Sequence, residues 1–525
     1  MKYDVIVVGG GVAGLTAATY ISKAGKKVIL IEKNEKCGGL VNTFERDGFY
    51  FDAGIKAIEN TGIVIPMVKE LDLDIEFLKS YVSIGIEDEV INIEDINSLN
   101  DYKELLSKFY PESKDEINAI IKVIRKVTRY VDTMYRIENP EFKNLKKDRD
   151  YIFKKLLPWL PSLIFTLFKI NTMSMPVEKY LENIIKTPSL RDVISQHFFK
   201  NTPAFFALGY FSMYLDYFYP RGGTGKLPEA LERKILENGG EISKETEIVK
   251  IVADKNLLKD QNGEIYEYKS LIWTADMKTF YSILETDNLN PNLRKKVEET
   301  KRKVLSCRGG DSIFEVFLEV DEPVETFGKI STGHFFYTPS RKGLDGIRRS
   351  ELYKLMDTSL KKQDVLNWVK KFVQFNTFEI SIPGLKDPNM IPEDKTGVIV
   401  NFLADYELFK KVEEAGWYEE FKAEIEKLVI ETLSNTIYPF LKTKLIRSFS
   451  LSPLSVQKRV GTSEGAITGW AFDSIPVVNR LYRINRSVMT PFPNIFQAGQ
   501  WVYSPAGVPM SILTGKLAAK KILMR

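Results

Sequence analysis

Three glycines near the amino terminus have the spacing that holds nucleotide phosphates. Residues 5–18 read VIVVGGGVAGLTAA, in which Gly9, Gly11 and Gly14 form the pattern G-x-G-x-x-G. The first glycine of such a pattern permits a tight turn, the second lets the backbone approach a pyrophosphate, and the third lets a helix pack closely on a sheet. The amino terminus of the following helix adds free N–H groups and the positive end of its dipole.

The elements around these glycines favour a dinucleotide site over a simple turn. The apolar run at residues 3–9 predicts a buried parallel strand, and the small residues at 13–25 predict a tightly packed helix. A second predicted strand, residues 26–33, carries Glu32, where an acid can accept hydrogen bonds from both hydroxyls of an adenosine ribose. The same acid would repel a 2′-phosphate, so NADP is disfavoured and FAD and NAD remain. A glutamate on the surface at the end of a strand is the simpler alternative.

The length and composition of the chain limit the classes of function that it can have. A chain of 525 residues can hold two or three domains, and 74 basic against 70 acidic residues give no field that would favour nucleic acid as a partner. Two histidines and two cysteines make a Ser-His-Asp relay, a metal site and a disulfide framework improbable. We expect no metal and a cytoplasmic protein. The first strand follows Met1 so closely that we expect no secretory signal.

Three blocks of the sequence resemble one superfamily of FAD-dependent enzymes. EKNEKCGGLVNTFERDGFYFDAG, residues 32–54, is similar to the segment after the ribose acid in the amine oxidase and phytoene desaturase superfamily. YPRGGTGKLPEAL, residues 219–231, and LIWTAD, residues 271–276, resemble stretches of phytoene desaturases, carotenoid isomerases and retinol saturases. NIFQAGQWVYSPAGVPMSILTGKLAAKKIL, residues 494–523, resembles their carboxyl-terminal block. NAD-only dehydrogenases lack the first block, so the resemblance implies FAD.

The resemblance also implies the fold and the cofactor contacts. We expect an α/β protein in which a Rossmann-type FAD-binding domain, residues 1–75, 217–289 and 451–525, carries a discontinuous α+β substrate domain, residues 76–216 and 290–450. The final helix would point its positive end at the flavin pyrimidine edge and favour an anionic reduced flavin. No cysteine occurs in the final block, so we expect non-covalent FAD. The expected cofactor-binding residues are Gly9, Gly11, Val12, Ala13, Gly14, Glu32, Lys33, Gly38, Gly39, Leu40, Gly54, Val249 (through its backbone), Gly499, Gln500, Gly507, Val508 and Pro509.

An aromatic segment is the candidate for the substrate site. Residues 205–219 read FFALGYFSMYLDYFY, a density of rings that suits a slot for a long apolar molecule. A helix that packs against the sheet explains it equally well. The expected substrate-contacting residues are Phe205, Phe206, Tyr210 and Tyr214. No catalytic acid or base can be named, since Asp216 and Asp473 suit surface or capping roles equally well.

Two further segments predict helices of different kinds. Residues 113–134 combine a capping box, Ser113 to Glu116, with an apolar face of Ile117, Ile120, Ile121, Ile124, Val127 and Val131. LLPWLPSLIFTLF, residues 156–168, is shorter than the roughly 20 residues that span a bilayer and contains two prolines. Its basic and aromatic approach suits peripheral contact with the inner face of a membrane, and a buried lid helix explains it equally well.

The leading hypothesis is an FAD-dependent oxidoreductase that acts on carbon–carbon bonds of a lipophilic polyene or isoprenoid, as a desaturase, saturase or isomerase. The partner is then a hydrophobic small molecule; the oligomeric state is not predicted. A flavin amine oxidase or protoporphyrinogen oxidase-like enzyme would use the same cofactor fold. A lipid-escort protein resembling the Rab dissociation inhibitors would share the two-domain plan, but the intact Gly9, Gly11, Gly14 and Glu32 argue against it.

Overall fold

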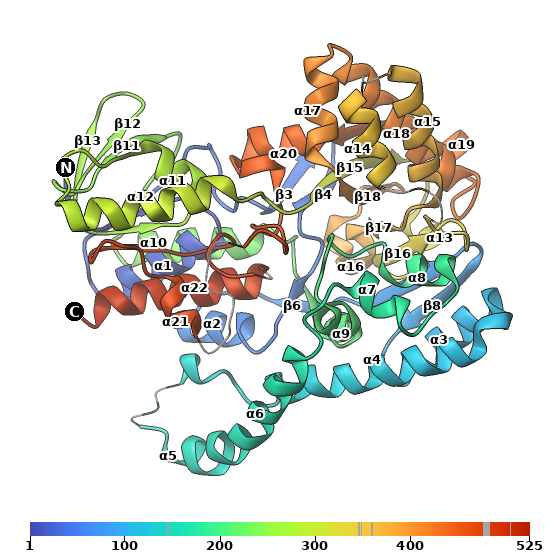
Figure 1. Ribbon diagram of the computed structural model, residues 1–525, viewed down its shortest axis with the longest axis horizontal. Coiled ribbons are helices and arrows are strands. Elements are labelled where there is room, and N and C mark those ends of the chain that lie inside the picture. The colour runs from blue at the N-terminus through green and yellow to red at the C-terminus, as the bar shows by residue number, and fades with distance from the viewer. Residues whose placement is uncertain are drawn as a thin grey trace.

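The computed structural model describes residues 1–525 except 144, 146, 345, 346, 348, 359, 360, 476–482 and 505. Two large sheets organise these residues. One occupies the half of the molecule that contains both termini, and the other lies in the opposite half (Figure 1). A three-stranded sheet, formed by β5 (Ile58–Glu59), β9 (Tyr217–Pro220) and β6 (Phe77–Lys79), adds a third layer.

The first sheet carries the expected nucleotide-binding strands. Its parallel part runs in the order β10 (Glu241–Ser243), β2 (Val28–Ile31), β1 (Lys2–Val8), β13 (Ile265–Trp273) and β20 (Ile495–Gln497). Strands β12 (Leu257–Asp260), β11 (Ile248–Val252) and β14 (Leu284–Glu285) extend it beyond β13. Valine, isoleucine and leucine fill β1 and β2, and their side chains are almost entirely buried, as in a parallel sheet covered on both faces.

Helices α1 (Val12–Lys23), α10 (Lys226–Glu237) and α22 (Val508–Leu523) cover one face of this sheet. Gly14 lets α1 lie against the turn before it, because a Cβ on Gly14 would stand 1.9 Å from the carbonyl oxygen of Gly9. Helices α11 (Met277–Ile283) and α12 (Pro291–Ser306) pack on the other face. The α/β class with a Rossmann-type arrangement is therefore confirmed.

The second sheet has mixed, mostly antiparallel strands. Its order is β19 (Leu445–Leu451), β15 (Ser312–Val320), β18 (Thr396–Ala404), β17 (Phe378–Ser381), β16 (His334–Thr338), β7 (Val82–Ile86) and β8 (Glu89–Ile93). Helices α15 (Lys362–Phe375), α17 (Tyr406–Glu414) and α18 (Tyr418–Ser434) share its main core. A second core joins it to α3 (Ser98–Phe109), α4 (Lys114–Tyr135), α8 (Pro188–Ser195) and α9 (Ala204–Tyr214).

The two large sheets draw their strands from different segments of the chain. All strands of the first lie within 1–75, 217–289 and 451–525, and those of the second lie within 76–216 and 290–451. Helix α12 departs from this division, since its Val297 and Val304 belong to the core of the nucleotide sheet. The domain boundaries given above stay a prediction.

Helix α4 has the predicted buried face but not the predicted cap. Its isoleucines and valines are buried together. The Ser113 side chain makes no cap hydrogen bond, because its hydroxyl pairs with the Thr187 hydroxyl at 2.7 Å. Glu116 accepts instead from the backbone N–H of Lys186 at 3.0 Å. The capping-box prediction is wrong because both side chains take tertiary partners.

The apolar run at residues 156–168 is part of a longer helical stretch. α5 (Arg149–Tyr151), a π-helical turn (Ile152–Leu156) and α6 (Leu157–Asn171) form one helical stretch of 23 residues. Pro158 is the second residue of α6, whereas Pro161 lies inside the helix. By length and composition this is the one membrane-crossing candidate among the described residues, and 11% of its most apolar window is buried.

Candidate functional site: a nucleotide groove and an adjoining cavity

The glycine-rich turn between β1 and α1 forms the floor of a groove. Gly9 has a φ of +106°, and a Cβ there would stand 2.8 Å from the backbone nitrogen of Ala275, so only glycine fits. A Cβ on Gly11 would meet nothing within 4 Å, and Gly11 lines the groove together with Val12 and Ala13 at the start of α1. The open space beside Gly11 and the N–H groups of α1 fit a pyrophosphate.

Glu32 stands at one end of this groove, at the carboxyl end of β2. One of its carboxylate oxygens accepts from the N–H of Gly10 at 2.6 Å, and the other accepts from the backbone and side chain of Asn34 at 2.9 and 2.8 Å. Glu32 is buried yet lines the groove. These bonds hold the carboxylate beside the glycine turn, which is where an adenosine ribose lies in a dinucleotide fold.

The carboxyl-terminal block lines the same groove. Gly499, Gln500, Trp501, Gly507 and Val508 line the groove, and α22 begins at Val508. The amino-terminal N–H groups and the positive dipole end of α22 therefore point toward the groove. An electron-rich ring edge would be stabilised there.

The structure gathers most of the expected cofactor-binding residues around one groove. Thirteen line it: Gly9, Gly11, Val12, Ala13, Glu32, Lys33, Gly38, Gly39, Leu40, Gly499, Gln500, Gly507 and Val508. Gly14 and Gly54 support it from behind, since a Cβ on Gly54 would stand 2.2 Å from the Leu40 carbonyl oxygen. Pro509 lies in the first turn of α22 without lining the groove. Val249 does not line the groove, although its neighbours Glu247 and Ile248 do. The side chain of Val249 is exposed.

Several residues that line the groove were not among the predicted cofactor contacts. Thr274 donates to the carbonyl oxygen of Gly9 at 2.8 Å and so fixes the turn. Thr462 accepts from the Gln500 side chain at 3.1 Å, and Gly461 lies against the Lys33 side chain. The stretch LIWTAD, residues 271–276, contains Thr274 and was the sequence signal for it. No sequence motif indicated that residues 460–462 line the groove.

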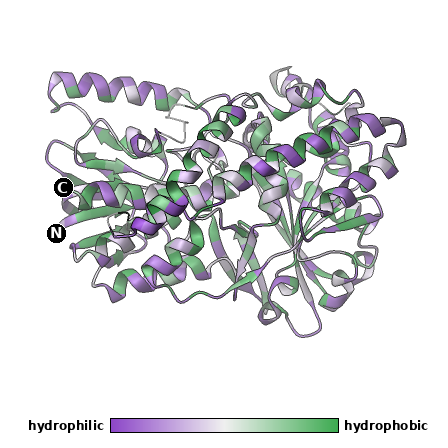
Figure 2. Ribbon diagram, turned by 90° about the horizontal axis from the view of Figure 1, so that it is seen from below, coloured by the Kyte–Doolittle hydropathy of each residue, from purple (hydrophilic) through white to green (hydrophobic). Residues whose placement is uncertain are grey.

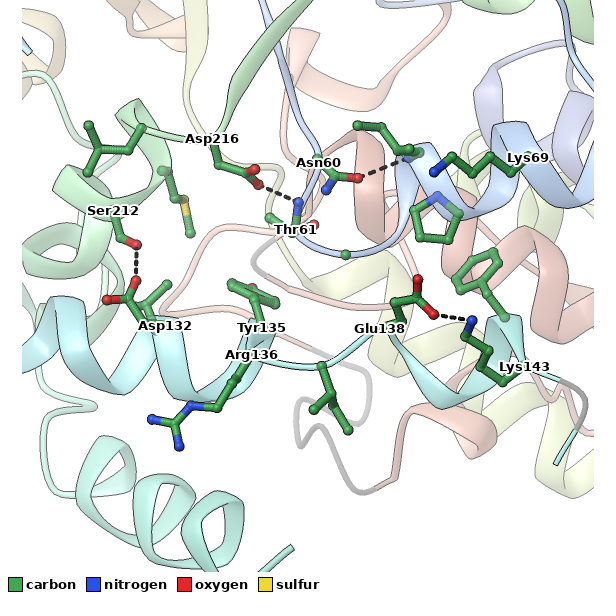
Figure 3. A pocket seen from close by; sticks show the side chains of 18 of the residues that line it. Asn60, Thr61, Lys69, Asp132, Tyr135, Arg136, Glu138, Lys143, Ser212 and Asp216 are labelled. Carbon is green, nitrogen blue, oxygen red and sulfur yellow. Dashed lines mark hydrogen bonds and ion pairs between the residues drawn. The ribbon is translucent and has the colours of Figure 1, made fainter. Parts of the chain in front are cut away.

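A cavity of 810 Å³ opens where α4, α9 and the loop before α2 (Val64–Leu71) converge (Figure 3). Asp216 accepts from the backbone N–H of Thr61 at 2.6 Å, and Ser212 donates to Asp132 at 2.8 Å. Tyr135 lies between these pairs. Burial raises the pKa of Asp216. The lining mixes polar side chains with apolar ones such as Ile65, Val131 and Met213.

The four aromatic residues proposed for substrate do not share one slot. Tyr210 and Tyr214 line a small, mostly apolar cavity of 50 Å³ with His197, Phe198 and Phe336. Phe205 and Phe206, one turn earlier in α9, lie outside it. A space of this size is far smaller than the roughly 300–1,000 Å³ of small-molecule sites. In this structure the cluster packs as core between α4 and the second sheet.

A buried charged cluster joins the segment after β4 to the second large sheet. Lys56, just after β4 (Phe49–Gly54), pairs with Glu315 of β15. Lys386 donates to the Lys56 carbonyl oxygen at 2.6 Å, and burial lowers the pKa of Lys386 to about 7. Beside them, His334 and Glu379 approach to 2.8 Å. Sequence reasoning missed this cluster because its members are far apart in the chain.

Comparisons with known proteins agree with this geometry. The family model described as flavin containing amine oxidoreductase matches residues 12–523. All-trans-retinol 13,14-reductase of Danio rerio is 22% identical over 540 residues, which cover 95% of this chain and 82% of that protein. Prolycopene isomerase 2 of an Oncidium hybrid cultivar is 22% identical over 482 residues, covering 85% and 71%. An oxidoreductase structure from Methanosarcina mazei covers all of both chains with a TM-score of 0.61 at 14% identity, which shows a shared fold.

The chain belongs to the flavin-containing amine oxidoreductase family. It is an FAD-dependent oxidoreductase, so the expected superfamily, the cofactor and the enzyme class are confirmed. The individual cofactor contacts and the absence of a covalent flavin link stay predictions.

Proposed function

We propose that this enzyme acts on carbon–carbon bonds of a lipophilic polyene or isoprenoid. The observation that carries the proposal is similarity along nearly the whole chain to a retinol 13,14-reductase, together with similarity to a prolycopene isomerase. Both names refer to conjugated isoprenoid substrates. The likeness to amine-oxidising structures extends only to the fold, at 14% identity.

Each part of the site has a task in this reaction. Bound FAD would supply or accept the hydride. Gly11 and the start of α1 would hold its pyrophosphate, Glu32 would hold its ribose, and the amino terminus of α22 would stabilise its ring. The cavity of 810 Å³ is within the range of small-molecule sites.

The polar residues of the cavity lining limit the class of substrate that the cavity can bind. Asn60, Thr61, Ser212 and Asp216 would lose hydration against a pure hydrocarbon and gain nothing in return. A polyene with a polar end group, such as an alcohol, can satisfy them. We therefore expect an alcohol-ended polyene to be bound more tightly than a hydrocarbon of equal length.

Incubation with a substrate panel tests the proposal. FAD-loaded enzyme is mixed with all-trans-retinol, a hydrocarbon carotene and putrescine, with either oxidised flavin and an artificial acceptor or chemically reduced flavin. Chromatography with mass detection separates loss of two hydrogens, gain of two hydrogens and isomerisation. Turnover of a polyene supports the proposal. Peroxide release with putrescine and no polyene product would instead support an amine oxidase.

We further propose that α5 and α6 bring the enzyme to a membrane. These helices extend from the body of the molecule below α4, and Figure 2 looks onto that side. Phe153, Leu157, Ile164, Phe165 and Phe168 are between 47% and 67% exposed. Lys154 and Lys155 flank them. Trp159 donates to the carbonyl oxygen of Thr133 at 2.6 Å. This hydrogen bond holds α6 against the turn of α4 that carries the cavity residues Asp132 and Tyr135.

Vesicle flotation tests this contact. Binding to vesicles of phosphatidylserine and phosphatidylcholine should exceed binding to phosphatidylcholine alone, and Lys154→Gln with Lys155→Gln should remove roughly 2 kcal/mol, about 1 per lysine. Phe165→Asp with Phe168→Asp should abolish flotation. Leu236→Asp, at an exposed leucine of α10, is the matched control. Equal flotation of all variants would contradict the contact.

A further inference from the structure

One buried lysine joins the helices of the nucleotide groove to the walls of the cavity. Lys516 lies on α22 and keeps only 6% of its surface exposed. Its ammonium group donates to a carboxylate oxygen of Glu70, and the hydroxyl of Tyr20 donates to the same oxygen at 2.7 Å. The ammonium nitrogen also lies over two rings, 4.0 Å from the centroid of Phe142 and 4.9 Å from the centroid of Tyr20. A buried cation is stable only with partners of this kind.

The partners of Lys516 come from both parts of the site. Tyr20 is on α1, whose first turn lines the nucleotide groove. Glu70 is near the end of α2, and Phe142 ends the 3₁₀ turn Pro140–Phe142 that follows α4; both residues line the cavity of 810 Å³. Lys516 itself is on α22, which begins at the groove. Two elements of the groove and two walls of the cavity therefore meet at one ammonium group.

The two helices pack closely between this point and the groove. A Cβ on Gly515 would meet the carbonyl oxygen of Ala13 at 2.4 Å, so α22 approaches α1 too closely for a side chain there. Tyr20 and Lys516 each lie eight residues after the first residue of their helix, which is about 12 Å along the helix axis. The cavity walls are thus joined to the groove through two packed helices.

We propose that Lys516 is a positioning residue that holds the substrate cavity in a fixed place relative to the flavin ring. This assignment rests on the proposed function, because a reacting polyene carbon has to lie in contact with the flavin. A displacement of about 1 Å can slow such a reaction by about 100-fold. Without the ammonium group, the carboxylate of Glu70, whose side chain is 37% exposed, turns to solvent. The end of α2 and the turn at Phe142 then move independently of α22.

Substitutions of Lys516 and Tyr20 in the FAD-loaded enzyme test the assignment. Lys516→Met keeps an apolar stem without the charge; it should bind FAD like the wild type and lower kcat for a polyene by roughly 10- to 100-fold, with a much smaller change in KM. Lys516→Arg can keep the ion pair and the ring contact and should recover most of kcat. Tyr20→Phe removes one hydrogen bond to Glu70 and should cause a smaller loss, so it serves as the test if Lys516→Met does not fold.

Lys521→Met is the matched control, because it removes the same charge from the last turn of α22, and it should behave like the wild type. A role of Lys516 in stability alone predicts a lower melting temperature and loss of FAD, with unchanged kcat per bound flavin. Unchanged kcat per bound flavin in both Lys516→Met and Tyr20→Phe would therefore overturn the assignment.

Hydrogen exchange measured by mass spectrometry gives a readout that does not depend on turnover. Peptides that cover residues 64–71 and 136–142 should exchange faster in FAD-loaded Lys516→Met than in the wild type or Lys521→Met, whereas the peptide of β1 should be unchanged. Equal exchange of both cavity segments in all three proteins would overturn the assignment. If the wild type turns over no polyene, the proposed function fails, and the exchange rates still decide whether Lys516 holds the cavity walls.

Discussion

The substitution Glu32→Gln tests the contact with the cofactor separately from the stability of the fold. The two carboxylate oxygens offer about four acceptor positions. Protein groups occupy three of them, through Gly10 and Asn34. One position is left for a ribose hydroxyl, and a hydrogen bond to a charged group contributes about 1.5–3 kcal/mol. Glu32→Gln should therefore weaken FAD binding by about 10- to 150-fold.

Titration of flavin-free protein with FAD, followed by flavin fluorescence, measures this change. Glu35→Gln removes the same charge from an exposed position nearby and should bind FAD like the wild type. The melting temperature of the flavin-free Glu32→Gln variant reports any loss from the Gly10 contact. If both variants bound FAD with equal affinity, the ribose would not lie at Glu32 and the direction of the dinucleotide would be wrong.

Two further predictions follow from the groove and from the buried cluster. Gly11→Ala places a Cβ in open space, so the flavin-free variant should melt like the wild type but retain no FAD; Gly14→Ala places one 1.9 Å from a carbonyl oxygen and should destabilise the fold itself by about 1–3 kcal/mol or more. Thermal melting and flavin content check both, and loss of stability in Gly11→Ala would contradict the first. Burial lowers the pKa of Lys386 to about 7, while the unfolded chain holds that proton up to a pH of about 10. The unfolded state binds more protons in this window, so the stability of the wild type relative to Lys386→Met should rise between about pH 7 and pH 9. A constant difference in denaturant titrations would show that Lys386 remains charged in the fold.

Local sequence was enough to predict the nucleotide half of the site. The tight turn at Gly9, the close packing at Gly14 and the acid at the end of β2 depend on neighbours within about 30 residues, and their spacing reports them directly. Thr462 and Gly461 join the groove only through tertiary folding, and no pattern in the chain announces them.

The substrate half could not be predicted in the same way. Its cavity is assembled from Asn60, Asp132 and Ser212, which lie on three separate elements. The aromatic density of residues 205–219 indicated burial correctly, but burial alone does not distinguish a packed core from a slot. A tertiary contact also overrode a local rule, since Ser113 pairs with Thr187 rather than capping α4. Pro161 lies inside α6, although proline usually disfavours the interior of a helix.

A crystal structure of the protein with FAD tests the central claim most directly. The account predicts the adenosine ribose at Glu32, the pyrophosphate beside Gly11 and Val12, and the flavin ring at the amino terminus of α22. A dinucleotide bound in the opposite direction would contradict it.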